Sequence, residues 1–207
     1  MIICPAQHFD IFSIMNIERQ SFIPAIQEKK RVFEKRLKIF PEGFLLLADC
    51  SDEVVLKNKT ALVCGYLCSE RWDFLPACDE KLLRKRFALG HNPLHTHKTE
   101  GPFLYISSFA LLKDYRSKGL GSKFFKNAVA ALCSSLHGIE KVVIIVNSEW
   151  EAALKIYRSI GFEEYFILKE FFPTIQKKVC SDGIIMTLDA AKFREMEFSG
   201  GEEAIKI

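Results

Sequence analysis

The chain has 207 residues, of which 49% are apolar, enough for the core of one large domain or of one domain with an insertion. Its 29 basic and 26 acidic residues leave a net charge of +3, without the concentrated basic face typical of a nucleic-acid-binding protein. No apolar run is long enough to cross a bilayer, and the first residues do not form a signal peptide. The seven cysteines include no CxxC pair, which indicates reduced thiols. We therefore expect a cytoplasmic protein that binds neither nucleic acid nor membrane.

The first forty residues predict one short strand and two helices. Residues 2–4 suit the strand, and Asp10 is a suitable N-cap for a helix that ends near Pro24. A second helix, over about residues 27–40, carries apolar side chains on one side and basic side chains on the other. Both helices are therefore expected to lie with one face on a core.

Two strands and a long irregular segment follow these helices. Residues 44–48 and 61–68 predict neighbouring antiparallel strands, with the polar residues 51–60 as their connection. Residues 69–101 predict irregular structure around one helix at residues 79–87. Long loops in compact domains are often functional, so this segment is a candidate for substrate contacts.

Three histidines, His91, His95 and His97, lie close together in the irregular segment. Zinc normally takes four tetrahedral ligands with cysteine or carboxylate support, and the sequence shows no such spacing. We therefore predict no metal site and interpret the three residues as part of a surface loop. The alternative is that His95 or His97 lies near a substrate, because the loop leads into the central strand of the next segment.

A strand, a glycine-containing turn and a helix follow between residues 103 and 136. Residues 103–112 are almost continuously apolar, as in a strand buried on both faces, and helical spacing resumes at Phe124. The turn between them contains Gly119 and Gly121, whose backbone is free to take positive φ and to approach a ligand closely. Because the first turn of a helix attracts anions, the turn predicts a phosphate or pyrophosphate site. The alternative is an ordinary strand-to-helix turn with solvated cations.

The same order of elements recurs in the last third of the chain. Residues 141–146 predict a strand and residues 149–160 a helix that ends at Gly161 and Phe162. Residues 163–171 and 183–189 predict a final antiparallel pair of strands, and residues 190–207 form a charged tail.

Two motifs in this order resemble the GNAT superfamily of N-acetyltransferases. They are the Arg-x-x-Gly-x-Gly turn at Arg116 and the Tyr-x-x-x-Gly-Phe helix end at Tyr157. Within the superfamily, the N-terminal half most resembles the arylalkylamine N-acetyltransferases. The resemblance implies an α/β (α+β) fold with a mixed central sheet of about seven strands and about four flanking helices. It covers one domain over residues 1–189, followed by the tail, which is a frayed helix or disordered.

The resemblance also implies roles for particular residues, with acetyl-CoA as cosubstrate and no metal. Tyr157 is expected to donate a proton to the departing thiolate, because a phenol is protonated at neutral pH. A β-bulge in the central strand is expected to present backbone N–H groups, and the glycine turn to hold the pyrophosphate. Asn147 is expected either to contact the pantetheine arm or to cap a helix. The residues expected to bind acetyl-CoA are Phe109, Ala110, Leu111, Arg116, Ser117, Lys118, Gly119, Leu120, Gly121, Ser122 and Asn147.

The general base is not evident from the sequence. Tyr105 and Ser107 stand where the arylalkylamine enzymes have two histidines, and neither is a good base at neutral pH. Deprotonation of the amine then uses water, His95 or His97, or the amine's own equilibrium. The departure also puts an aromatic amine acceptor in doubt.

We predict an acetyl-CoA-dependent N-acetyltransferase that acts on a small primary amine. Two alternatives stay open, namely an enzyme that acetylates a protein or peptide, and a non-catalytic acyl-CoA-binding sensor. A homodimer formed through an exposed strand edge also stays open.

Overall fold

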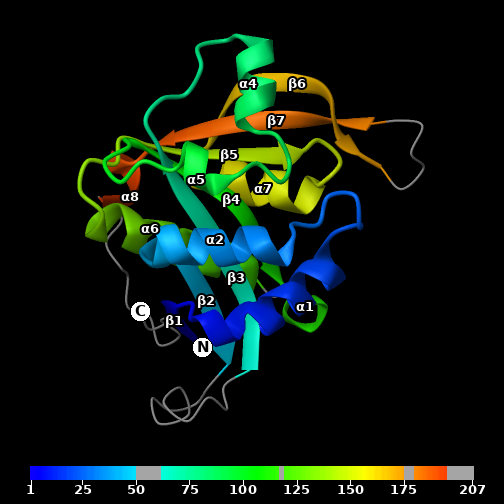
Figure 1. The fold of residues 1–207 in the computed structure, drawn as a ribbon, viewed down its shortest axis with the longest axis vertical. Coiled ribbons are helices and arrows are strands. Elements are labelled where there is room, and N and C mark those ends of the chain that lie inside the picture. The colour runs from blue at the N-terminus through cyan, green and yellow to red at the C-terminus, as the bar shows by residue number, and fades with distance from the viewer. Residues whose placement is uncertain (50–61, 117–118, 175–179, 195–207) are drawn as a thin grey trace.

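The computed structural model describes residues 1–49, 62–116, 119–174 and 180–194, and in them seven strands form one mixed sheet (Figure 1). The order across the sheet is β1-β2-β3-β4-β5-β7-β6. Only β4 and β5 run parallel, while the other neighbouring pairs are antiparallel. The strands are β1 (Ile2–Pro5), β2 (Phe44–Asp49), β3 (Leu62–Trp72), β4 (Phe103–Leu111), β5 (Lys141–Asn147), β6 (Glu163–Pro173) and β7 (Cys180–Asp189). The predicted mixed sheet of seven strands is thus confirmed.

Seven α-helices occur in the described residues, whereas the resemblance implied about four. The difference comes from short helices, since α4, α5 and α8 have seven, four and four residues. The helices are α1 (Ile11–Ser21), α2 (Lys30–Ile39), α4 (Glu80–Arg86), α5 (Pro93–Thr96), α6 (Leu120–Ser135), α7 (Glu151–Ile160) and α8 (Ala191–Arg194). Three 3₁₀ turns accompany them at His8–Asp10, Pro41–Gly43 and Lys113–Tyr115.

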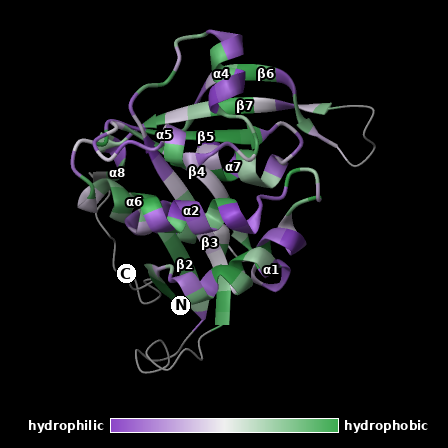
Figure 2. Ribbon diagram, in the orientation of Figure 1, coloured by the Kyte–Doolittle hydropathy of each residue, from purple (hydrophilic) through white to green (hydrophobic). Residues whose placement is uncertain are grey.

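The helices cover both faces of the sheet. On one face, α6, α7 and α8 pack on apolar side chains from the central strands in a single core cluster. On the other face α1 and α2 form a second cluster with β2 and β3, and α4 forms a third around Trp72. Figure 1 shows α2 crossing in front of β3 and β4, and Figure 2 shows hydrophilic colour along much of its outer surface. Burial of one stripe of each helix therefore holds the layers together.

Local sequence signals set several helix ends. The Asp79 carboxylate accepts a hydrogen bond from the N–H of Leu82 at 3.0 Å and caps α4, which begins one residue after the predicted start at residue 79. Gly161 has φ +102° and ends α7, where its N–H and that of Phe162 bond carbonyls of the last turn. α1 ends at Ser21, before Pro24, as predicted.

Strand β3 is longer than the sequence predicted. It continues past Cys68 to Trp72, through Glu70 and Arg71, which were assigned to the irregular segment. These polar residues look like a loop in the sequence, yet Glu70 and Arg71 are buried. Their charges are tolerated inside the fold because each has hydrogen-bonding partners there.

Some predictions fall on residues outside the described part of the chain. These are the connection at residues 51–60 and residues 195–207 of the predicted tail. The tail begins with α8, whose Phe193 is buried in the core beside α6. No helix of the described residues is long and apolar enough to cross a membrane.

Gly101 provides a test of the packing at the start of β4. A Cβ at this position would lie 2.4 Å from the backbone oxygen of Trp72. Because that atom belongs to a buried strand and cannot move freely, Gly101→Ala should lower the free energy of unfolding by about 1–3 kcal/mol. Urea denaturation measures the change. Gly121→Ala is the control, since its Cβ would meet only atoms at 3.8 Å, and an equal loss in both variants would contradict the prediction.

Candidate active site

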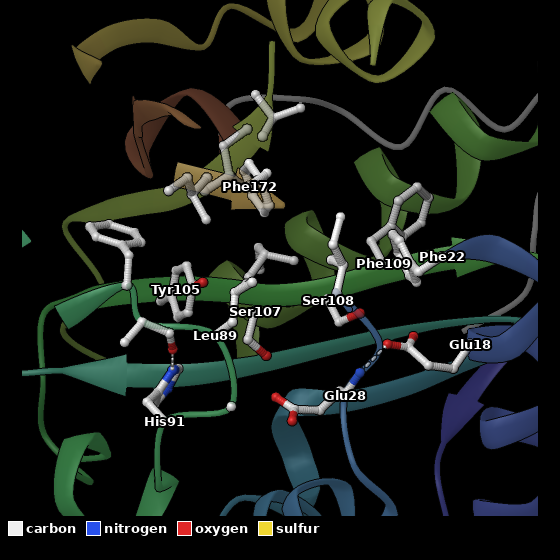
Figure 3. A pocket seen from close by; sticks show the side chains of 18 of the residues that line it. Glu18, Phe22, Glu28, Leu89, His91, Tyr105, Ser107, Ser108, Phe109 and Phe172 are labelled. Carbon is white, nitrogen blue, oxygen red and sulfur yellow. Dashed lines mark hydrogen bonds between the residues drawn. The ribbon is translucent and has the colours of Figure 1, made fainter. Parts of the chain in front are cut away.

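The sheet opens between its two parallel strands. β4 and β5 pair only over Phe103–Ile106 and Lys141–Ile144, and both then run on without pairing to each other. β5 stays bonded to β7 and β4 to β3 on their other edges, so neither strand loses its place in the sheet. A cavity of about 90 Å³ is lined by residues 106–109 of β4 and 144–146 of β5 (Figure 3). The candidate site therefore lies where the two strands part.

A β-bulge at Ser107 marks the point of divergence. The register with β3 passes from Cys68 opposite Ser108 to Ser69 opposite Ile106, which leaves Ser107 without a partner. Its hydroxyl donates to the Cys68 carbonyl at 3.0 Å. Because a bulge bends its strand, β4 turns away from β5 directly after the last paired residue. The resemblance implied a bulge around Phe109–Leu111, and the structure places it two residues earlier.

The backbone of β4 beyond the bulge presents alternate residues to the opening. The N–H of Leu112 donates to the Cys64 carbonyl of β3 at 2.8 Å, so by alternation Ala110 also faces β3. Leu111 faces the other way, and its carbonyl accepts bonds from Arg116 Nε and Nη2 at 2.9 and 2.8 Å. Of the three predicted backbone donors, Phe109 and Leu111 face the opening, and Ala110 does not.

The glycine turn forms the start of α6. Gly119 precedes the helix with φ +71°, as the sequence predicted for a glycine in this turn. Leu120, Gly121 and Ser122 form the first helical turn, whose N–H groups have no partners within the helix. Arg116 Nη2 also donates to Ser21 Oγ at 2.7 Å, so its guanidinium ties the turn to α1 and to the end of β4. Ser117 and Lys118 lie outside the described residues.

Tyr157 reaches the cavity from α7. It is 9% exposed and packs against Phe125 and Phe162, with ring centroids 5.0 and 5.8 Å away. Burial raises the pKa of its hydroxyl above the ordinary phenol value. Phe162 N–H bonds the Tyr157 carbonyl at 3.1 Å, so the Gly-Phe sequence both ends the helix and fixes the tyrosine's backbone.

Asn147 ends β5 and organises the turn into α7. Its Oδ1 accepts a hydrogen bond from the N–H of Glu149 at 2.8 Å, and its carbonyl accepts from Trp150 N–H at 3.0 Å. The side chain thus stabilises the turn before α7 and does not cap the helix, whose N-cap is Trp150. A contact of Asn147 with the pantetheine arm stays a prediction.

A buried ionic network lies on the α1–α2 side of the cavity. Glu70 accepts hydrogen bonds from Arg36 Nε at 2.9 Å and from Thr96 and Trp72, and His91 Nε2 lies 2.8 Å from it. Arg36 also bonds Glu28 through Nη1 at 2.9 Å. Although burial opposes ionisation, His91 and Arg36 hold the pKa of Glu70 well below its usual range. The network thus links β3, α2 and residues 88–97.

The three histidines of the irregular segment have separate environments. His91 lines the cavity, with Nδ1 3.0 Å from the Ala88 carbonyl and Nε2 facing Glu70. His97 accepts the N–H of Arg71 and packs on Phe40, and burial lowers its pKa. His95 is exposed on α5. The histidine that reaches the cavity is therefore His91, not His95 or His97 as the sequence alternative had it.

A second polar chain joins α1 to the cavity. The Tyr66 hydroxyl donates to Glu18 Oε2 and lies 2.8 Å from Ser108 Oγ on β4. Glu18 Oε1 accepts the N–H of Glu28 at 2.7 Å. Burial, the largest influence, raises the pKa of Glu18 to about 7, although the hydrogen bonds from Glu28 and Tyr66 oppose this rise. In Figure 3 the Glu18 and Glu28 carboxylates lie on the same side of the cavity as the Ser107 and Ser108 hydroxyls.

The sequence contains a signal for these buried charged residues that the predictions above did not use. Glu18 follows Ile11 and Ile14 at helical spacing, so it occupies the apolar face of α1. Arg36 stands on the face of α2 that buries Phe33 and Leu37. A charged residue on an otherwise buried helix face needs a partner, and the partners here come from another element.

Comparisons with known proteins agree with this architecture. Residues 11–162 match the acetyltransferase (GNAT) family. The ribosomal-protein-S18-alanine N-acetyltransferase of Escherichia coli is 16% identical, with a TM-score of 0.63 over 97% of this chain and 98% of that one. A GNAT-like decarboxylase, GphF, in complex with isobutyryl-CoA is 15% identical, with a TM-score of 0.69 over 92% and 100%. Arabidopsis thaliana Naa50, in complex with a bisubstrate analogue, is 14% identical, with a TM-score of 0.59 over 90% and 96%. No curated protein matches the chain.

The sheet of this protein opens between two parallel strands, and a glycine turn follows one of them. Together with the family match, these features place the fold in the acyltransferase class. The chain belongs to the acetyltransferase (GNAT) family. The arylalkylamine branch is not supported by these matches, in keeping with Tyr105 and Ser107 at the positions of its histidines.

Glu18 makes stability depend on pH. Its folded-state pKa of about 7 lies above the ordinary 4.5, so the folded state holds the proton more tightly, and stability falls as pH rises from 4.5 through 7. Glu18→Gln imitates the protonated form and removes this loss, which is on the order of 2–3 kcal/mol. Thermal melts from pH 5 to 8 should show the variant gaining on the wild type. Glu34→Gln, on the outer side of α2, is the control, and a constant gap for Glu18→Gln would contradict the assignment.

Proposed function

We propose that this protein transfers the acetyl group of acetyl-CoA to a primary amine. The observation that carries the proposal is the position of Tyr157, whose buried side chain lines the cavity where β4 and β5 part. A proton donor at that place is what thioester cleavage requires, because the departing thiolate must be protonated.

The residues around the opening suit acetyl-CoA. Gly121 has no positive φ, and a Cβ there would make only ordinary contacts at 3.8 Å, so the fold itself does not require glycine. A glycine at this position instead leaves room for a ligand to approach the backbone closely. The first turn of α6 supplies N–H groups for the pyrophosphate, and the N–H groups of Phe109 and Leu111 are directed to the opening. When bound, acetyl-CoA supplies the activated acyl group.

The chemistry at the thioester requires two contributions from the chain, one at the carbonyl oxygen and one at the sulfur. The amine nitrogen forms a C–N bond at the thioester carbonyl carbon, the C–S bond breaks, and the electron pair leaves on sulfur. N–H groups of β4 stabilise the charge that develops on the carbonyl oxygen. Tyr157 gives its proton to sulfur, since burial keeps the phenol protonated at neutral pH.

The shape of the cavity supports a small acceptor. Its volume of about 90 Å³ suits the reactive end of an amine rather than a folded polypeptide surface. Phe22 packs on Trp150, and Trp150 on Phe172, with ring centroids 5.4 and 5.6 Å apart. These three rings line the cavity and offer an apolar wall beside the polar groups of Glu18 and Ser108.

A second candidate acceptor is the α-amino group of a peptide. Several similar structures are of enzymes named for such substrates, including the Escherichia coli ribosomal-protein-S18-alanine N-acetyltransferase and a NatC complex bound to Gag peptide and CoA. The α-amino group of the peptide would enter the same cavity, and the rest of the peptide would lie outside it.

Replacement of Tyr157 tests the proton donor. Tyr157→Phe keeps the packing against Phe125 and Phe162 but has no hydroxyl, so kcat should fall about 100-fold or more while acetyl-CoA still binds. Fixed-time assays of CoA thiol release measure kcat, and the thermal shift on addition of acetyl-CoA measures binding. Tyr165→Phe, which removes a hydroxyl bonded to the Pro76 carbonyl, is the matched control. Unchanged turnover in Tyr157→Phe would exclude this role.

A panel of amines tests the acceptor class. Thiol release is measured with 2-phenylethylamine, spermidine, lysine and the peptide MVNAL, each with acetyl-CoA. We expect turnover of a small amine, because the reactive cavity is small and has an aromatic wall. Turnover of MVNAL alone would identify the peptide candidate. Stabilisation by acetyl-CoA without turnover of any amine would favour a non-catalytic acyl-CoA-binding protein instead.

A further inference from the structure

We propose that the acceptor binds as an ammonium ion and gives its proton to Glu18 through the hydroxyls of Ser108 and Tyr66. This inference rests on the proposed acetyl transfer and assigns the proton acceptor that the sequence does not reveal.

The three side chains form a continuous path from the cavity to a buried carboxylate. Ser108 lies on β4 directly after the bulge and lines the cavity, as Glu18 does. Tyr66 lies between them, with its hydroxyl 2.8 Å from Ser108 Oγ and donating to Glu18 Oε2. Tyr66 is fully buried and held by Phe33 and Phe44, whose ring centroids lie 5.5 and 6.2 Å away. The path is therefore fixed by the core and does not depend on a mobile side chain.

Hydrogen bonding gives the path a direction. Tyr66 donates to Glu18, so its oxygen is free to accept from Ser108, and the Ser108 oxygen is then free to accept from the cavity. Before attack, the ammonium ion loses one proton to Ser108 Oγ, Ser108 passes its own to Tyr66, and Tyr66 passes its own to Glu18 Oε2, which leaves a neutral amine with a free electron pair. After the C–N bond forms, the nitrogen loses its second proton as the C–S bond breaks, and this proton replaces the one that Tyr157 gives to sulfur. Each hydroxyl ends with one proton, and Glu18 ends protonated.

The surrounding charges favour a cation in the cavity. Arg36 forms ion pairs with both Glu70 and Glu28. Within the described residues the Glu18 carboxylate forms no ion pair, so its charge is the uncompensated one of this wall. An ammonium ion at Ser108 would compensate it, and the binding itself would favour the ionised carboxylate.

The groups that face Glu18 support its use as a base near neutral pH. They are Tyr66 from β3, Glu28 from the residues before α2, and Arg36 from α2. Together with burial, they give Glu18 a pKa of about 7, which suits a group that must both accept and release a proton.

The other candidate bases near the cavity are engaged elsewhere. Ser107 donates to the Cys68 carbonyl, and Tyr105 stacks on Trp72 with centroids 4.1 Å apart. His91 has both nitrogens occupied, as described above. Of the two carboxylates that line the cavity in the described part of the chain, Glu28 pairs with Arg36, whereas Glu18 is connected to Ser108 through the Tyr66 hydroxyl.

The test compares Glu18→Gln and Tyr66→Phe with the wild type. kcat/KM is measured from pH 5.5 to 8.5 at saturating acetyl-CoA, with 2-phenylethylamine and with MVNAL. The wild-type value should rise through a midpoint near pH 7. Both variants should lose about 100-fold in kcat, and Glu18→Gln should lose the midpoint near pH 7. Glu34→Gln and Tyr165→Phe are the matched controls, and stabilisation by acetyl-CoA shows that each variant is folded.

A second readout does not depend on turnover. Titration calorimetry of the same amines at pH 7, in two buffers of different ionisation enthalpy, counts the protons released on binding. The wild type should release protons from Glu18 as the ammonium ion binds, and Glu18→Gln should release none. Equal release in both proteins, an unchanged pH profile in Glu18→Gln, or full turnover in Tyr66→Phe would overturn the proposal. Absence of turnover in the wild type with every amine of the panel would instead contradict the proposed function.

Discussion

The site depends on one constraint in the sheet, namely that β4 and β5 pair over only four residues. Each strand keeps a full antiparallel neighbour on its other edge, so the opening between them does not dissolve the sheet. The bulge at Ser107 sets where the opening begins, and it leaves backbone groups of the following residues directed to the gap. Tyr157 from α7 and Ser108 from β4 then reach the same cavity from opposite faces of the sheet.

A buried ionic network builds the other wall of this cavity. Glu70 on β3 bonds Arg36 on α2 and faces His91, so three segments far apart in the chain are joined through one carboxylate. Buried charges of this kind are tolerated only where hydrogen bonds replace the lost water. Arg36 of this network pairs with Glu70 and Glu28, whereas Glu18 forms no ion pair among the described residues. Glu70 and Arg36 thus stabilise the fold, while the neighbouring Glu18 is the carboxylate proposed to take part in the chemistry.

Membership of the GNAT family gives the fold and the acyltransferase class, but not the acceptor. The similar structures share 14–16% identity with the chain, and they include a GNAT-like decarboxylase as well as N-acetyltransferases. Because one fold hosts several reactions, the assignment of a reaction has to rest on individual side chains. Here these are the buried phenol of Tyr157 and the path from Ser108 to Glu18.

The sequence by itself determined the order of the strands and helices along the chain, the glycine turn before α6 and the helix end after Tyr157, because each rests on local periodicity or on backbone freedom. It also indicated that the histidines of the arylalkylamine branch are missing. Only the tertiary structure decided that β3 runs through Glu70 to Trp72, that the bulge lies at Ser107, and that His91 rather than His95 or His97 reaches the cavity. It likewise decided the role of Glu18, since a buried carboxylate takes its pKa and its partners from residues 10 and 48 positions away, which no local pattern encodes.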